Sequence, residues 1–164
     1  MAQRFVRIDL SGTNGDFRPV AIEPGLPLLD TPGGNGRIVS RWLGRLAGLP
    51  EWQGQSVGFF VQDDQGGRLE EIYCQPATRA DLQEFLGDEL QILQRRIDAI
   101  RPETPSEREL AAALQRSFRE LAQDASRTDL DDYFFRYRDV HGHWRLVWCW
   151  GYTRTDQELA PAVI

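Results

Sequence analysis

The chain has 164 residues, of which 41% are hydrophobic and 27% are charged, and its formal net charge is −6. This length and composition predict a single globular domain, 1–164, and exclude a disordered chain. The acidic balance disfavours binding to the phosphate backbone of a nucleic acid. All 19 basic residues are arginine, so Schiff-base chemistry and a P-loop lysine are excluded.

The first ten residues contain neither the basic segment nor the long apolar segment of a signal peptide. No apolar run approaches the roughly 20 residues that span a bilayer. The two cysteines, Cys74 and Cys149, are too few for a disulfide framework. We therefore expect a soluble, reduced, cytoplasmic protein that does not associate with a membrane.

The first third of the chain predicts two strands, a long loop and a short helix. Residues 4–10 alternate between polar and apolar side chains, which indicates a strand. Residues 17–22 can return as a second strand, in which Pro19 is typical of a sheet edge. The proline- and glycine-rich residues 23–36 predict a loop. Residues 37–49 repeat apolar side chains at helical spacing and predict a helix.

The middle of the chain predicts a β-hairpin followed by a long helical hairpin. Residues 56–74 contain two β-rich runs around an Asp-Gln-Gly-Gly turn. Thr78 can form a capping box with the acid three residues later, at the start of a helix that extends to Ile100. Thr104 caps a second helix, with proline at its first position. Because the connection is short, the two helices should pack antiparallel.

Residues 59–81 align without a gap with residues 134–156, at an offset of 75, and eight of the 23 aligned positions are identical. The identical residues include an aspartate and a glycine three positions later, which suit a hairpin turn with a left-handed glycine. They also include a Thr-Arg-x-Asp pattern, which suits the start of a helix. The repeat is interpreted either as a duplicated hairpin-plus-cap unit or as convergence on common hairpin chemistry.

Residues 134–149 form the second predicted hairpin, which is dense in aromatic side chains. If its turn pairs Asp139 with His143, both faces of the hairpin are largely apolar. This pattern predicts a central hairpin that is covered on both sides. Cys149 on this hairpin and Cys74 on the first one are therefore expected to be buried and unreactive.

No set of residues in the sequence converges on a catalytic site. His141, His143 and Asp139 are metal-ligand types, but neighbouring turn positions diverge, so no metal or cofactor is expected. The serines lack the nucleophile-elbow motif, and the acidic pairs are adjacent residues that point to opposite faces of a strand. The aromatic and arginine side chains of 136–152 could stack single-stranded bases, but the net acidity argues against this. The sequence therefore favours a non-enzymatic protein.

The helical hairpin carries the leading functional hypothesis, a protein-interaction or accessory module that acts within a larger assembly. Apolar residues flank the seam between its helices, and such a face can bind a protein partner or a second copy of the chain. The candidate partner-binding residues are Leu82, Phe85, Ala111 and Ala122. Packing of the seam against the sheet is the alternative.

A second hypothesis is a binding site for a small anionic or nucleotide-like ligand. Glycines that precede a helix can hold an anion through backbone N–H groups, and nearby arginines can supply counter-charges. The candidate ligand-binding residues are Gly33, Gly34, Gly36, Arg37 and Arg41. The same glycine clusters also occur in ordinary turns.

These elements predict an α+β fold, with a mostly antiparallel sheet of about six strands built from β-hairpins. One short helix precedes the middle hairpin. A long antiparallel helical hairpin is inserted between the two similar hairpins and separates the two copies of the repeat.

Overall fold

The computed structural model describes residues 5–10, 17–23, 26–29, 34–53, 56–69, 72–123 and 127–154. Helices and strands are mixed within them, which confirms the α+β class. The strands are β1 (Phe5–Asp9), β2 (Phe17–Pro19), β3 (Ala21–Glu23), β4 (Leu26–Pro27), β5 (Leu49–Gln53), β6 (Ser56–Phe60), β7 (Gln75–Pro76), β8 (Phe134–Arg138), β9 (Trp144–Trp148) and β10 (Tyr152–Arg154). The helices are α1 (Gly34–Leu43), α2 (Arg79–Gln83), α3 (Gly87–Asp98) and α4 (Pro105–Ala122), with short 3-10 helices η1 (Gly44–Leu46) and η2 (Leu130–Asp132).

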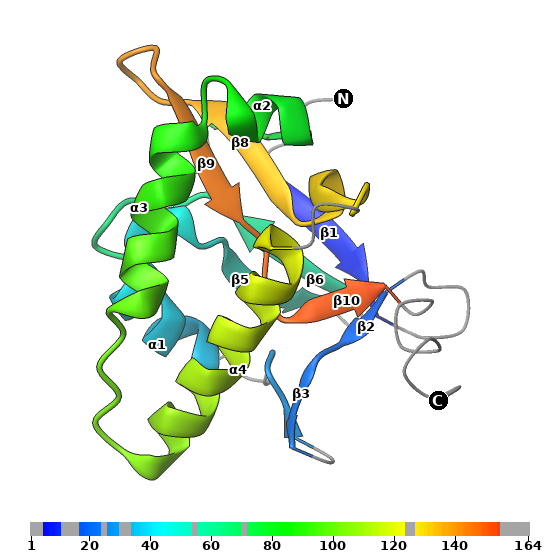
Figure 1. The fold of residues 1–164 in the computed structure, drawn as a ribbon, viewed down its shortest axis with the longest axis vertical. Coiled ribbons are helices and arrows are strands. Elements are labelled where there is room, and N and C mark those ends of the chain that lie inside the picture. The colour runs from blue at the N-terminus through cyan, green and yellow to red at the C-terminus, as the bar shows by residue number, and fades with distance from the viewer. Residues whose placement is uncertain are drawn as a thin grey trace.

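The strands of the described residues form two antiparallel three-stranded sheets and two short pairs (Figure 1). The sheet orders are β1-β6-β5 and β7-β8-β9, and the pairs are β10-β2 and β3-β4. This arrangement differs from the single sheet that the sequence predicts. Proline accounts for part of the division, because it donates no backbone hydrogen bond and stands at the ends of β2, β4 and β7.

The two three-stranded sheets meet where β9 passes η1 and the start of β5. Ala47 forms a parallel bridge with Trp148, and the Gly48 N–H donates to the Trp148 carbonyl over 2.9 Å. The indole N–H of Trp150 donates to the Gly48 carbonyl over 3.0 Å. These bonds connect the N-terminal sheet to the β8–β9 hairpin, and side chains of both sheets contribute to one core.

Two segments pair differently from the sequence-based expectation. In residues 56–74 the first arm forms β6, whereas the described part of the returning arm contributes only the bridge between Gln62 and Arg68. Strand β6 pairs instead with β1 and β5, which occupy both of its edges. Likewise, β2 pairs with β10 rather than with β1. Partners that are distant along the chain decided both pairings.

The helical segment contains three helices rather than the expected two. Thr78 and Asp81 make a capping box at the start of the short helix α2, and α3 begins separately at Gly87. Thr104 caps α4 by accepting from the Glu107 N–H over 3.1 Å. Helices α3 and α4 run in opposite directions (Figure 1). None of the helices in the described residues combines the length and apolar character that a membrane crossing requires.

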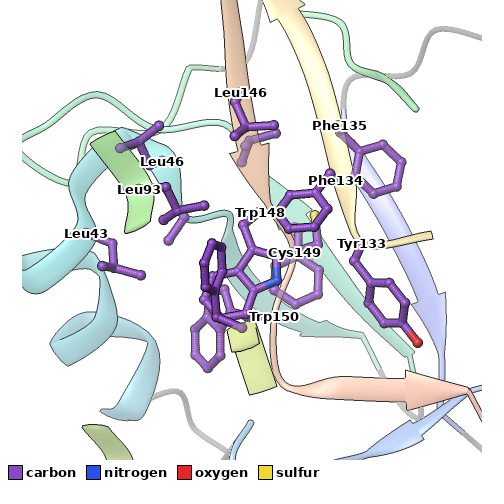
Figure 2. Close-up of a cluster of buried hydrophobic side chains, with 14 of the residues drawn as sticks. Leu43, Leu46, Leu93, Tyr133, Phe134, Phe135, Leu146, Trp148, Cys149 and Trp150 are labelled. Carbon is purple, nitrogen blue, oxygen red and sulfur yellow. The ribbon is translucent and has the colours of Figure 1, made fainter. Parts of the chain in front are cut away.

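The β8–β9 hairpin lies within the core (Figure 2). Phe134 pairs with Trp148, and the Asp139 N–H donates to the His143 carbonyl over 2.9 Å, which is the register that makes both faces apolar. Trp148 is fully buried and meets Phe118 of α4 edge-on, with 5.5 Å between the ring centroids. Figure 2 shows the Trp148 side chain between leucines of η1 and α3 on one side and Phe134 on the other.

The two copies of the sequence repeat share a turn geometry. Asp63 and Asp139 each accept, through Oδ1, the backbone N–H groups two and four residues later. Gly66 and Gly142, three residues after each aspartate, have φ angles of 83° and 79°, which glycine adopts without strain. The two turns therefore correspond at an offset of 76, one residue away from the sequence alignment.

Beyond the turn the two copies differ. Thr78 caps a helix, whereas Thr153, which aligns with it, lies in strand β10. The second copy returns as strand β9, whereas the described part of the first copy returns with a single bridge. A shared turn of this kind serves any hairpin, so a common origin of the two copies stays a prediction.

Both cysteines are buried in the core, as expected. Burial raises the pKa of Cys74 to about 12 and also raises that of Cys149.

Because the thiolate is the reactive form, we expect a thiol reagent to modify the native protein about 100-fold or more slowly than the urea-unfolded chain. Absorbance of the released reagent group gives both rates, and the unfolded chain provides the control. Rapid modification of both cysteines in the native state would show that the hairpin faces are assigned wrongly.

Candidate functional site

The glycines predicted to bind an anion do not gather into one site. Gly33 lies outside the described residues. Gly34 is exposed at the start of α1, whereas Gly36 is buried against Pro50, where an added Cβ would come within 2.9 Å of the proline Cγ. Close packing of α1 on β5 therefore accounts for Gly36 without a ligand.

Arg37 and Arg41 share a hollow of about 430 Å³ beside the turn that follows β6. Gly34 and Gly36 do not line this hollow. Acidic side chains offset the two arginines, because Glu107 pairs with Arg41 over 3.1 Å and a carboxylate of the turn also lines the hollow. The arginines lie together as the ligand hypothesis requires, but apart from the helix start, and anion binding here stays a prediction.

The predicted partner-binding residues divide into buried and exposed side chains. Leu82 and Ala111 are each 4% exposed, and Ala122 is partly buried against the core. Phe85, in the turn between α2 and α3, is 43% exposed. Phe85 is therefore the one member of this set that offers a large apolar surface to a partner.

Phe85 belongs to a cluster that a tryptophan and two arginines complete. Its ring centroid lies 5.7 Å from that of Trp144 on β9. The guanidinium carbons of Arg136 and Arg138 lie 4.4 Å and 4.8 Å from the Trp144 ring centroid. These are the spacings of aromatic and cation–π contacts. We call Phe85, Arg136, Arg138 and Trp144 the aromatic–arginine patch.

The other exposed large hydrophobic side chains of the described residues lie near the same end of the β8–β9 hairpin. Val140, in the hairpin turn, is 87% exposed. Tyr73, which is 50% exposed, precedes strand β7, and Gln75 of β7 pairs with Arg136. In Figure 1 this end of the hairpin lies beside α2 and projects away from the start of α4.

Most of the aromatic side chains that the sequence suggests for stacking nucleic-acid bases are buried and cannot contact a base. Trp148, Trp150 and Tyr152 are at most 2% exposed. Trp144 is partly exposed, but Phe85 and two arginines already contact its ring. The aromatic side chains of this hairpin are therefore mainly core residues.

The histidine pair forms part of an exposed turn. The rings of His141 and His143 lie 6.4 Å apart, and Asp139 directs Oδ1 to their backbone N–H groups. Within the part of the chain that the structure describes, no group of three or more His, Cys, Asp or Glu side chains could hold a metal ion. The turn geometry accounts for the conspicuous aspartate beside the two histidines.

Sequence reasoning missed an ionic network centred on Glu89 of α3. Its buried carboxylate accepts two hydrogen bonds from Arg45 of η1, over 2.6 and 2.8 Å. It also accepts from the Leu146 N–H of β9 over 3.2 Å and lies 3.5 Å from Nη1 of Arg145. One signal could have revealed it, because Glu89 stands four residues before the buried Leu93 and thus on the apolar face of the helix.

The network and the two turns beside it, after β6 and between β8 and β9, lower the pKa values of three acids. Burial alone would raise the pKa of Glu89, but hydrogen bonds, first that from Arg45, together with nearby positive charge outweigh burial and lower it. The backbone hydrogen bond from Arg45 is the main cause of the lowered pKa of Asp64. The hydrogen bond from the His143 N–H is the main cause that lowers the pKa of Asp139 to about 2.

Three features of the described residues could receive a ligand or partner. They are the aromatic–arginine patch, the small arginine-lined hollow, and a larger hollow of about 660 Å³ between the turn that follows β6 and the β8–β9 hairpin. Comparison of the chain with protein-family models, with curated proteins and with solved structures gives no match. A function is therefore inferred from these surfaces and their chemistry.

Replacement of Glu89 by alanine should lower the free energy of unfolding by about 3–5 kcal/mol, because Arg45 would keep a charge without its partner at a site only 18% exposed. Glu51→Ala is the matched control, since Glu51 pairs with Arg68 at the surface and such pairs contribute about 1 kcal/mol or less. Urea unfolding measures both losses. Equal losses would contradict the role assigned to the buried pair.

The melting temperature should be nearly constant between about pH 5 and 7 and should fall as the pH is lowered further. Each acid has a lower pKa in the folded state than its ordinary pKa, which is 4.5 for Glu89 and 3.8 for Asp64 and Asp139. This difference stabilises the fold fully when the pH is above the ordinary pKa. This stabilisation is lost as the pH falls through the folded-state values, the lowest of which is about 2. Circular-dichroism melts across this range test the window, and a pH-independent melt would contradict it.

Proposed function

We propose that the protein is a non-enzymatic interaction module that acts within a larger assembly and binds its partner through the aromatic–arginine patch. One observation carries this proposal. The large hydrophobic side chains that are exposed in the described residues, Tyr73, Phe85 and Val140, lie at or near the distal end of the β8–β9 hairpin. Aromatic and arginine side chains of such clusters dominate the binding energy of many protein interfaces.

The seam between the helices supports this surface rather than forming it. Its central residues, such as Leu93 of α3 and Leu114 of α4, are fully buried within the chain. The α2–α3 turn then carries Phe85 to the outside, against Trp144. Contacts among aromatic and arginine side chains restrict their rotamers before a partner arrives, which reduces the entropy lost on binding.

The charge of the patch favours an acidic segment of a protein partner. Arg138 is exposed and makes no ion pair with a described residue, although the chain as a whole has a net charge of −6. Asp81 lies 3.5 Å from Arg136 and so offsets only one of the two guanidinium groups. An acidic residue next to an apolar one could pair with Arg138 while its neighbour packs on Phe85 and Trp144.

The double substitution Phe85→Ser with Arg138→Glu should weaken partner binding by about 30-fold or more, the effect of losing one interface hot spot. The tagged wild-type chain and the variant are each used to capture proteins from nuclease-treated lysate, and the captured protein is then titrated against both. Cross-linking with mass spectrometry should place the contact in an acidic segment of that protein.

Arg108→Glu is the matched control, because Arg108 is an exposed arginine in the first turns of α4, far from the hairpin end in Figure 1. The control should bind as the wild type does, and all three proteins should have similar melting curves. Equal binding by the patch variant and the wild type would overturn the assignment of this surface. Capture that occurs from untreated lysate but not from the nuclease-treated lysate would point to a nucleic acid, and variant-sensitive dimerisation would point to a second copy.

A further inference from the structure

The larger hollow lies on the opposite face of the β8–β9 hairpin from the aromatic–arginine patch. It has a volume of about 660 Å³, is partly open to solvent, and includes Tyr137 and Arg145, which pair across the two strands. Successive side chains of a strand point to opposite faces, so their neighbours Arg138 and Trp144 lie on the other face and belong to the patch. The volume falls within the range of small-molecule sites, about 300–1,000 Å³.

Groups of both charges line this hollow. Asp63, Asp64 and Arg68 come from the segment after β6, and Asp139 and Arg145 come from the hairpin. In Asp63 and Asp64, Oδ1 accepts two hydrogen bonds, whereas Oδ2 accepts none from the described residues. Arg145 donates through Nε to Asp139 over 2.9 Å and places Nη1 3.5 Å from Glu89, so its Nη2 is left for a ligand.

The surrounding structure holds these charged groups in place. The backbone N–H groups of the turn fix Asp63, and the carboxylates of Asp139 and Glu89 fix Arg145. Leu69, Ile72 and Val140 add apolar surface to the hollow. A site whose polar groups are already oriented loses less entropy when it binds a ligand.

We propose that this hollow binds a small zwitterion with an apolar side chain, either a free α-amino acid or a short peptide with free termini. The ligand carboxylate would accept from Arg145, and its ammonium group would donate to Oδ2 of Asp63 and Asp64. The apolar side chain would pack on Leu69 and Ile72.

The balance of charge separates this ligand class from simpler ions. Among the described residues, three arginines and three aspartates line the hollow, so a ligand with only a negative charge would meet the aspartates and one with only a positive charge would meet the arginines. A ligand that carries both charges can pair with groups of both kinds. This site does not rest on the proposed protein-interaction function, because the four residues of the aromatic–arginine patch do not line the hollow; Val140, in the hairpin turn, lines the hollow and lies near both surfaces.

Thermal-shift titration of the full chain tests the ligand class directly. Leucine, phenylalanine and their dipeptides are compared with 4-methylpentanoate, which lacks the ammonium group, and with 3-methylbutylamine, which lacks the carboxylate. A zwitterion present at 100 times its Kd should raise the melting temperature by about 5–10 °C. Both singly charged analogues should bind about tenfold more weakly or worse. The tighter binder among the amino acids and dipeptides identifies the source of the ligand.

Asp63→Asn provides a conservative variant, because an asparagine Oδ1 can still accept both backbone N–H groups of the turn while the charge is removed. It should weaken binding of the zwitterion about tenfold, whereas binding of 4-methylpentanoate should not weaken, because the substitution removes a negative charge that repels this anion. Glu109→Gln, at an exposed position of α4, is the matched control and should bind as the wild type does. Ile72→Trp, which fills part of the hollow, should abolish binding.

The proposal is overturned if none of the zwitterions shifts the melting temperature. It is also overturned if 4-methylpentanoate binds as tightly as leucine, because the site would then recognise an anion alone. An unchanged affinity of Asp63→Asn for the zwitterion would show that Asp63 does not bind the ligand ammonium group. Selective loss of zwitterion binding in Asp63→Asn, with normal binding in Glu109→Gln, would support it even if Ile72→Trp failed to fold.

Discussion

The β8–β9 hairpin is apolar on both faces, and the other elements of the fold pack around it so that both faces are shielded from water. A sheet with one solvated face requires cover on one side only, whereas a hairpin of this kind requires a layer on each side. Helix α4 supplies Phe118 against Trp148 on one face. Residues between η1 and β5 bond to Trp148 and Trp150 along the edge of β9. The N-terminal sheet is thus joined to the hairpin by backbone as well as by side chains.

The burial and charge of the side chains change along the same hairpin, and this change determines where both candidate surfaces lie. Near Trp148 its side chains are buried, whereas toward the turn they become charged and exposed. Strand alternation then sends Arg138 and Trp144 to one face and Tyr137 and Arg145 to the other. The buried half anchors the exposed half, so the patch and the larger hollow are held on opposite sides of one rigid element.

Glu89 connects the helical layer to this hairpin in a way that apolar packing alone would not. Its carboxylate accepts from the Leu146 N–H on β9, an edge group that would otherwise need water or another strand. It also holds Arg45 and lies beside Arg145, which brings two of the three arginines to the larger hollow. A buried acid of this kind is costly unless every partner is present, which ties the hollow to the integrity of the core.

Local chemistry in the sequence determined the α+β class, the caps of α2 and α4, the turn at Asp139 and the burial of both cysteines, because each depends on neighbouring residues or on simple periodicity. Tertiary structure alone decided the strand partners of β2 and β6, since backbone pairing between distant segments leaves no local mark. It also decided that Leu82 and Ala111 are buried while Phe85 is exposed, because a side chain on an amphipathic helix is covered only by what packs against it. The Glu89 network and the larger hollow joined segments up to a hundred residues apart, and only the folded chain brought them together.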